Sequence, residues 1–197
     1  NTQPAILTVS VALHRILEAR GLMPKWVAGH SLGEYSALVS AGVLDVATAA
    51  RLVHNRGIYM QQAVPEGAGA MAAVLGLDRT EVDDLCNRCG GDLIVEVANV
   101  NAPGQVVVAG NTEAVNQLIS MSREAGARRA ILLNVSAPFH CSLMQPAAER
   151  LQKDLAEIEF ADPRFPVVCN VTATPITKGE AARVALEKQV TQPVLWS

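Results

Sequence analysis

The sequence predicts an α/β fold in which a parallel-sheet core carries an inserted subdomain of strands and helices. Half of the 197 residues are hydrophobic but only 4% are aromatic, so the core is built mainly from Ala, Val, Leu and Ile. Such a core suits helices packed on a parallel sheet. Two short apolar stretches, 25–28 and 166–171, are the candidate core strands.

The first residues predict a helix. Thr2-Gln3-Pro4 has the composition of a helix N-terminus, and an apolar stripe follows it as far as Gly21. The stripe consists of Ala5, Ile6, Val9, Leu13, Ile16 and Leu17. We therefore expect a mostly buried helix. A chain that opens inside a buried helix and stops at Trp196-Ser197 is expected to be a piece of a longer protein, with the remaining core strands beyond its ends.

The most informative feature is Gly29-His30-Ser31-Leu32-Gly33, a Gly-x-Ser-x-Gly sequence between the apolar stretch 25–28 and a helical pattern at 34–39. A serine on so tight a strand-to-helix turn is strained and exposed, and the flanking glycines let strand and helix pack closely. The N–H groups that follow lie at a helix N-terminus, where they can hold an oxyanion. This pattern predicts a nucleophilic Ser31 in an α/β-hydrolase-like core. A Gly-Ser turn with a helix-capping serine is the alternative.

The helix predicted from Asp45 to about Ala63 carries Arg56 on its apolar side. Its neighbours at helical spacing are Ala49, Leu52, Val53, Tyr59, Met60 and Ala63. A buried guanidinium is costly unless an anion pairs with it, and its planar fork suits a carboxylate or phosphate. Arg56 is therefore a candidate to bind such a group. An internal salt bridge, or snorkelling at the edge of the core, is the alternative.

His140 is the candidate general base. It lies on a junction loop between a strand ended by Pro138 and a helix opened by Pro146, where a base can be held rigidly. A helix-capping or partly exposed histidine is the alternative. No Asp or Glu stands out as a third triad member. Gln189 closes a helix, and a backbone carbonyl at that end is a candidate to orient the imidazole of His140.

The middle of the chain has its own organisation. Its expected strands are 70–77, 93–98, 105–109 and 129–135, and its expected helices are 80–89 and 112–125. The resulting βαββαβ order is that of a ferredoxin-like fold. We therefore expect two domains: an incomplete α/β-hydrolase-like core from 1–65 and 137–197, and a ferredoxin-like subdomain at 66–136.

Cysteine spacing, net charge and hydropathy argue against a metal or redox site, nucleic-acid binding and a membrane span. Cys86 and Cys89 match half of a redox or zinc motif, but their spacing places both on the apolar face of a helix, and no second pair completes a zinc site. We expect core packing, no metal and a reduced, cytoplasmic setting. The net charge of −3 gives no overall attraction to nucleic acid or anionic membrane. No apolar run approaches the about 20 residues of a membrane span.

Four stretches then stand in a recognisable order along the chain. They are Gly29–Ala37, Asn55-Arg56-Gly57 with Met60-Gln61, Ala137–His140 with Leu143-Met144, and Gln189 before Pro193-Val194 and Trp196. Together with the ferredoxin-like insert they resemble the family of malonyl-CoA:acyl-carrier-protein transacylases, relatives of polyketide acyltransferase domains. The likeness runs through nearly the whole chain.

The resemblance implies a role for each candidate residue. Ser31 would be the nucleophile, His140 the general base, and Arg56 the group that binds the free carboxylate of a malonyl group. The backbone carbonyl of Gln189 would orient His140. The amide of Leu32 would supply half of the oxyanion hole.

The resemblance also bears on specificity and partners. Phe139 is typical of malonyl-selective members, and Asn101 is expected to line the cleft from the insert. Malonyl-CoA would be the acyl donor and an acyl carrier protein the acceptor. The phosphopantetheine belongs to that partner, so no cofactor is expected, and we expect a monomer. Carrier proteins of this family are acidic, so Arg123, Arg128 and Arg129 are candidates for a basic patch, with an ordinary solvated face as the alternative.

The sequence departs from the family in one large respect. The family's first strand with a Gly-Gln-Gly-x-Gln loop, which gives the other oxyanion amide, is absent, as are its last strand and a Gly-Pro-Gly loop. Because one lost oxyanion donor costs roughly 100- to 1000-fold in rate, we expect this piece to be impaired and its parent protein to be active. Two other classes stay open: a serine esterase or thioesterase, and a non-catalytic piece that docks carrier protein.

Overall fold

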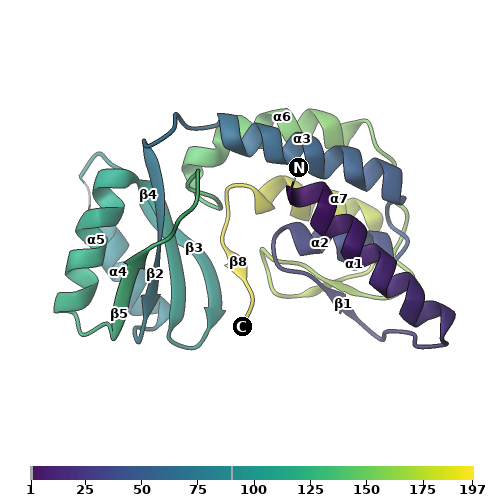
Figure 1. Ribbon diagram of the computed structural model, residues 1–197, viewed down its shortest axis with the longest axis horizontal. Helices are drawn as coiled ribbons and strands as arrows, with labels where there is room; N and C mark the ends of the chain where they lie inside the picture. The colour runs from purple at the N-terminus through teal and green to yellow at the C-terminus, as the bar shows by residue number, and fades with distance from the viewer. Residues whose placement is uncertain (1, 90) are drawn as a thin grey trace. The chain divides into compact units, whose positions relative to one another are not determined.

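The computed structural model describes residues 2–89 and 91–197 and divides into two compact units (Figure 1). The first unit runs from the N-terminal end to Tyr59 and from Glu149 to Lys188; the second comprises Met60–Ala148 and Gln189–Ser197. Each unit contains its own sheet, one of three strands and one of five. The predicted α/β class, with a parallel pair in one part and a ferredoxin-like sheet in the other, is confirmed.

The sheet of the first unit contains both predicted core strands. Its order is β1 (Val27–Ala28), β6 (Val167–Val168) and β7 (Pro175–Ile176). Strands β1 and β6 are parallel, with Val27 opposite Val167 and Ala28 opposite Val168, whereas β7 pairs antiparallel with β6. Strand β7 was not predicted from the sequence. Because β1 is short and ends at Ala28, the chain leaves this sheet immediately before the Gly-x-Ser-x-Gly sequence.

Five helices contribute to the first unit in whole or in part. They are α1 (Thr2–Ala19), α2 (Leu32–Ser40), α3 (Val46–Gln62), α6 (Gln145–Ala156) and α7 (Gly179–Gln189). Asp45 begins α3 as predicted, because its Oδ1 accepts hydrogen bonds from the N–H groups of Ala47 and Thr48. None of the helices among the described residues has the length and apolar character required to cross a bilayer.

The expectation that the first helix is mostly buried is wrong. Only Leu7 and Val11 of α1 are buried. The predicted stripe is largely exposed, with relative exposures of 49% for Ile6, 60% for Val9, 57% for Leu13, 49% for Ile16 and 47% for Leu17. Helix α1 packs mainly against α2. The apolar stripe is therefore wider than the surface that packs against it.

The second unit is built on the predicted βαββαβ segment. Its strands are β2 (Gly69–Leu75), β3 (Val95–Ala102), β4 (Gln105–Asn111), β5 (Arg129–Leu132) and β8 (Val194–Leu195), and its sheet order is β5-β2-β4-β3-β8. The first four pair antiparallel in the ferredoxin-like order. Strand β8, which the sequence analysis did not predict, adds in parallel to β3.

The two faces of this sheet are covered differently. Helices α4 (Arg79–Arg88) and α5 (Thr112–Glu124) cover one face (Figure 1), and the core between includes Leu85, Val108 and Leu118. Cys89 is buried in this core and Cys86 packs against it, as predicted. The other face is covered by the segment after β5, through Cys141 and Phe139. That segment carries His140.

Leu118→Ala should lower the free energy of unfolding of the second unit by about 2–5 kcal/mol, because Leu118 is fully buried and its loss leaves a cavity. Urea denaturation followed by circular dichroism measures the change. Gln117→Ala, an exposed position on the same helix, is the control and should change it by less than about 0.5 kcal/mol. Equal effects for the two variants would contradict the packing described for α5.

Candidate active site

Ser31 lies on a strained turn between β1 and α2. Its φ is 52° and its ψ is −104°, a backbone conformation that residues other than glycine rarely adopt. A Cβ atom on Gly29 would lie 2.0 Å from the Gly33 backbone, so the turn requires glycine there. Ser31 precedes α2 but makes no capping hydrogen bond with its side chain. The observed turn is therefore a nucleophile-elbow geometry rather than the capping turn considered as its alternative.

The backbone N–H groups of the turn have different hydrogen-bond acceptors. Ser31 N–H donates to Asn170 Oδ1 at 2.7 Å, Gly33 N–H to His30 O at 2.9 Å, and Glu34 N–H to Ser31 O at 3.1 Å. Among the described residues, no backbone hydrogen bond from the N–H of Leu32 is observed. This N–H lies at the N-terminus of α2, where a developing negative charge is favoured. This geometry suits the oxyanion role predicted for Leu32.

Arg56 reaches the hydroxyl of Ser31. Its Nη2 donates to Ser31 Oγ at 2.9 Å and its Nη1 to Gln3 Oε1 at 2.8 Å. The guanidinium carbon lies 5.6 Å from the centre of the Tyr35 ring. The structure thus brings together Ser31 and Arg56, two of the residues singled out from the sequence, while Gln3 was not anticipated.

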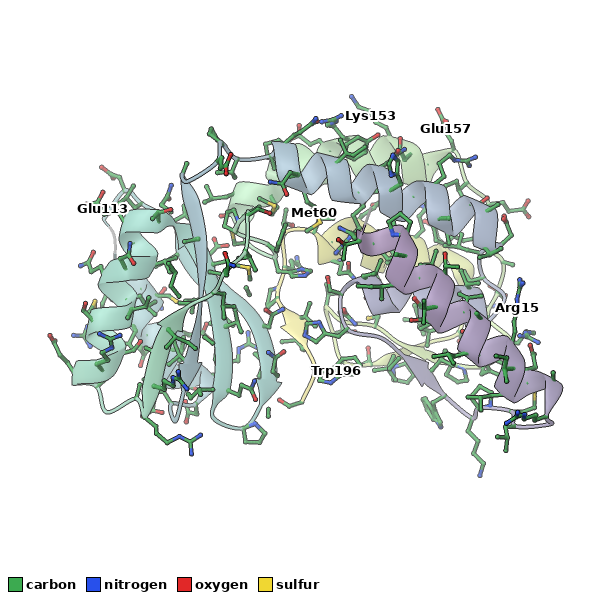
Figure 2. All side chains as sticks on the ribbon, in the orientation of Figure 1. Arg15, Met60, Glu113, Lys153, Glu157 and Trp196 are labelled. Atoms are coloured by element: carbon green, nitrogen blue, oxygen red, sulfur yellow. The ribbon has the colours of Figure 1, made fainter. Side chains whose placement is uncertain are left out.

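Burial makes Arg56 exceptional. Charged side chains such as Arg15, Glu113, Lys153 and Glu157 are exposed (Figure 2). Among the described Asp, Glu, Lys and Arg residues, the buried exceptions are Arg56, 2% exposed, and Glu34, 1% exposed. Burial lowers the pKa of the Arg56 guanidinium, and the neighbouring acidic groups of Tyr35 and Glu34 oppose that shift. A buried cation that bonds the Ser31 hydroxyl is a specific place for an anionic group.

His140 and Gln189 meet in the second unit. His140 is 4% exposed, has a φ of 61°, and its Nδ1 lies 2.7 Å from the backbone oxygen of Gln189 at the end of α7. Because a carbonyl oxygen only accepts, this hydrogen bond requires the proton to be on Nδ1. The Nε2 atom of the neutral ring then carries the lone pair, which suits a general base.

The loop that carries His140 is anchored on both sides of the histidine. Phe139 and Cys141 pack on one face of the five-stranded sheet. The carboxylate of Glu96, on β3, accepts hydrogen bonds from Ser142 N–H at 2.7 Å and from Ser142 Oγ at 2.8 Å. Burial raises the pKa of the Cys141 thiol to about 12, so this neighbour of His140 is an inert thiol at neutral pH. The strained backbone conformation of His140 is therefore maintained by the packing of its neighbours and by the hydrogen bonds to Glu96.

The remaining candidates lie in the second unit. Asn101 lies next to the last residue of β3 and is half-buried. Arg123, Arg128 and Arg129 are exposed near the end of α5 and the start of β5, and Arg123 Nη2 donates to Ala130 O at 3.1 Å. This bond holds a turn, so Arg123 has a structural contact whether or not it belongs to a basic patch.

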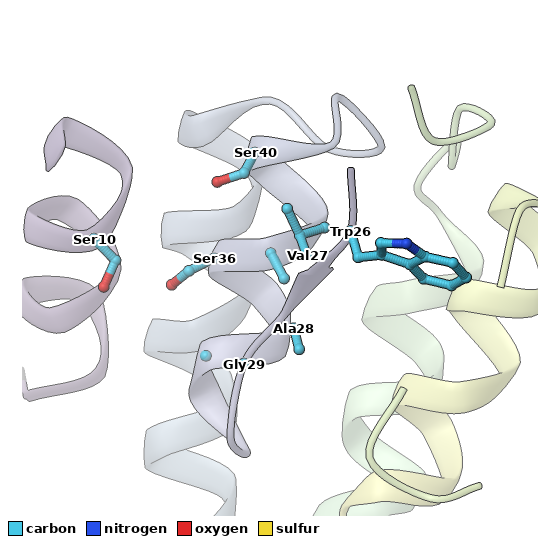
Figure 3. A pocket seen from close by; sticks show the side chains of 9 residues that line it. Ser10, Trp26, Val27, Ala28, Gly29, Ser36 and Ser40 are labelled. Carbon is cyan, nitrogen blue, oxygen red and sulfur yellow. The ribbon is translucent and has the colours of Figure 1, made fainter. Parts of the chain in front are cut away.

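A hollow of about 420 Å³ lies beside the elbow in the first unit (Figure 3). Its lining comprises Ser10, Trp26, Val27, Ala28, Gly29, Gly33, Ser36, Ala37 and Ser40. Most of these side chains are small, none is charged, and neither Ser31 nor Arg56 is among them. The hollow therefore lies between α1, β1 and α2, and the hydroxyl of Ser31 does not line it.

Sequence reasoning missed Gln3, Glu34 and Asn170 as members of this site. Asn170 did carry a signal, because it is a polar residue near the carboxyl end of the predicted core strand 166–171, where parallel sheets place their functional groups. Glu34 stands in the first turn of a helix, where an acidic residue is usually explained by the helix dipole. Nothing in the sequence pattern distinguishes Gln3.

Comparison with known proteins identifies close relatives. A model of the acyl transferase domain matches residues 1–196. The malonyl CoA-acyl carrier protein transacylase of Escherichia coli K12 is 52% identical over 197 residues, which is 100% of this chain and 64% of the relative. The transacylase of Staphylococcus aureus MSSA476 is 45% identical over 195 residues, covering 98% of this chain and 63% of the relative. The chain thus spans somewhat less than two thirds of the length of these relatives.

Solved structures of transacylases are similar to this chain as well. The malonyl CoA-acyl carrier protein transacylase of Coxiella burnetii has a TM-score of 0.97 at 46% identity, covering 99% of this chain and 62% of that one. A malonyl-transacylase solved in complex with a type II PKS acyl-carrier protein has a TM-score of 0.96 at 50% identity, covering 99% of this chain and 63% of that one.

The ionisation of Tyr35 tests the environment around Arg56. Burial raises the pKa of Tyr35 to about 12, because the phenolate is poorly solvated there. The chain has two tyrosines, so Tyr59→Phe isolates the signal of Tyr35. Tyrosinate absorbance of this variant should rise near pH 12 when folded and near pH 10, the ordinary value, in denaturant. A folded-state titration near pH 10 would contradict the buried environment.

Proposed function

The chain belongs to the acyl transferase domain family, and we propose that it moves a malonyl group from coenzyme A to the phosphopantetheine thiol of an acyl carrier protein. The observation that carries the proposal is the buried guanidinium of Arg56 bonded to the hydroxyl of an elbow serine. A serine alone suits any acyl transfer, whereas a serine paired with a buried cation suits an acyl group that ends in a carboxylate.

The first half-reaction forms an ester on Ser31. In this proposal His140 accepts the hydroxyl proton through Nε2 while Oγ attacks the thioester carbonyl. The Leu32 N–H, at the N-terminus of α2, donates to the oxyanion that develops. The C–S bond then breaks, the coenzyme A sulfur takes the proton from His140, and a malonyl-Ser31 ester remains.

The second half-reaction reverses these steps with a different thiol. The carrier-protein thiol gives its proton to His140 and attacks the ester carbonyl, and Ser31 Oγ recovers the proton as it leaves. No oxidant, metal or resident cofactor enters this balance, so coenzyme A and phosphopantetheine act as parts of the substrates. The four cysteines are free, which suits a reducing compartment, and we assign the reaction to the cytoplasm.

Arg56 has two tasks in this proposal. Its Nη1 and Nη2 groups, which bond Gln3 and Ser31 in the free protein, form a fork that a carboxylate can accept in bidentate fashion. Binding of the malonyl carboxylate selects the substrate. It also releases Ser31 Oγ from its hydrogen bond to Nη2, so the hydroxyl becomes available for attack as the substrate arrives.

The acyl-enzyme can be detected directly. After prolonged incubation with malonyl-CoA, intact-mass spectrometry should find one malonyl group, and peptide mapping should locate it on Ser31. Ser31→Ala should carry none. Ser36→Ala, which changes a buried serine on α2, should react like the unchanged chain. A second incubation adds an acyl carrier protein. Free malonate with neither an adduct nor malonyl-carrier protein would favour a hydrolase, and absence of all three products would leave only a docking role.

Arg56→Ala should lower the rate of malonyl transfer by about 10- to 150-fold, the equivalent of the 1.5–3 kcal/mol that a hydrogen bond to a charged group contributes. Acetyl transfer should fall much less, so the malonyl-to-acetyl ratio reports the effect. Arg51→Ala, an exposed arginine on the same helix, is the control. A malonyl preference that survives in Arg56→Ala would exclude the carboxylate role.

A further inference from the structure

Asn170 joins the turn after β6 to the elbow that carries Ser31. Its Nδ2 donates to Gly29 O at 2.8 Å and its Oδ1 accepts from Ser31 N–H at 2.7 Å. Its own N–H donates to Glu34 Oε2 at 3.2 Å. Asn170 is 2% exposed and Glu34 is 1% exposed. Three hydrogen bonds in a water-excluded place therefore fix the elbow to a turn about 140 residues further along the chain.

The chemistry of the partners fixes the orientation of the carboxamide. Gly29 O only accepts and Ser31 N–H only donates, so the amide nitrogen must face Gly29 and the amide oxygen must face Ser31. Both ends of the side chain are satisfied in this single arrangement. A turned amide would lose both hydrogen bonds.

The register of the sheet explains this pattern. Val27 lies opposite Val167 and Ala28 opposite Val168, so residue 30 stands at the level of residue 170. In a parallel ladder, a residue bonds to the C=O and N–H of the two residues that flank its partner. The carboxamide of Asn170 bonds to those two groups of residues 29 and 31. A side chain thus continues the ladder after the backbone strands have ended.

We propose that Asn170 is the positioning residue of the nucleophile. Its carboxamide holds Ser31 in the conformation with φ of 52° while the backbone of the elbow turns out of the sheet. It also occupies the N–H of Ser31 itself, which leaves the next N–H, that of Leu32, for the oxyanion. This role rests on the proposed acyl transfer only in that Ser31 is the reacting group.

Asn170→Ala should slow acylation of Ser31 by about 100-fold in single-turnover measurements, the cost of a nucleophile displaced by about 1 Å. The malonyl-CoA concentration that gives half of the maximal acylation rate should change little, because in this proposal Arg56 and not Asn170 binds the substrate. Hydrogen exchange of the Ser31 amide, measured by NMR, should accelerate. Asn55→Ala is the matched control: it also removes an asparagine hydrogen bond in the first unit, the 2.8 Å contact with Asp154, without touching the elbow.

Asn170→Asp separates positioning from general stability. A protonated carboxyl has the donor and acceptor of a carboxamide, whereas a carboxylate has acceptors only. The ionisable neighbours of this position are Glu34 on α2, which is acidic, and Arg56 on α3, which is basic, and burial favours the neutral acid. The acylation rate of Asn170→Asp relative to the unchanged chain should therefore rise as the pH falls. A purely structural role would give a ratio that follows only the fraction of folded protein.

A fluorophosphonate, which reacts with activated serines irrespective of acyl specificity, keeps the two proposals distinguishable. If the unchanged chain reacts with this reagent but not with malonyl-CoA, the proposed function fails and the fluorophosphonate rates decide the role of Asn170. Wild-type rates in Asn170→Ala, or losses equal to those of Asn55→Ala, would overturn the positioning role. An unchanged chain that reacts with neither reagent would overturn both.

Discussion

A serine with a positive φ persists only where its surroundings hold it there, and the candidate site depends on this constraint at Ser31. Gly29 admits the close approach of strand and helix, and the strain at Ser31 must be opposed by contacts from elsewhere. Those contacts come from Asn170, in a turn distant in sequence. The elbow is therefore a tertiary structure that a local sequence motif permits but does not by itself impose.

The second unit also contains a strained residue, and other contacts hold it. His140 also has a positive φ, and its loop is held by apolar packing of Phe139 and Cys141 and by the Glu96 carboxylate. The carbonyl of Gln189 then fixes the tautomer of the ring. Strain at both residues is matched by a dense set of contacts around each, which fits the general observation that strained backbone gathers at functional sites.

Much of this arrangement could be predicted because it follows from local periodicity. The elbow follows from glycine spacing, the inward direction of Arg56 from its apolar neighbours at helical intervals, and the ferredoxin-like order from alternating patterns. What could not be predicted depends on contacts between distant segments. The roles of Gln3 and Asn170, the short strands β7 and β8, and the extent to which α1 is covered all belong to this class, because periodicity identifies an apolar face but not its partner. The boundaries of the two predicted domains and the catalytic roles stay predictions.

The uncovered stripe of α1 has a consequence for colloidal behaviour. Leu17 and the neighbouring Leu22 and Met23 line a shallow depression of about 470 Å³, which continues the exposed apolar surface of the helix. A net charge of only −3 gives little mutual repulsion between molecules that carry such a surface. Self-association of the chain through this surface should therefore increase with protein concentration and with kosmotropic salt. Low concentration, low salt and mild non-ionic detergent are the conditions under which its chemistry is best measured.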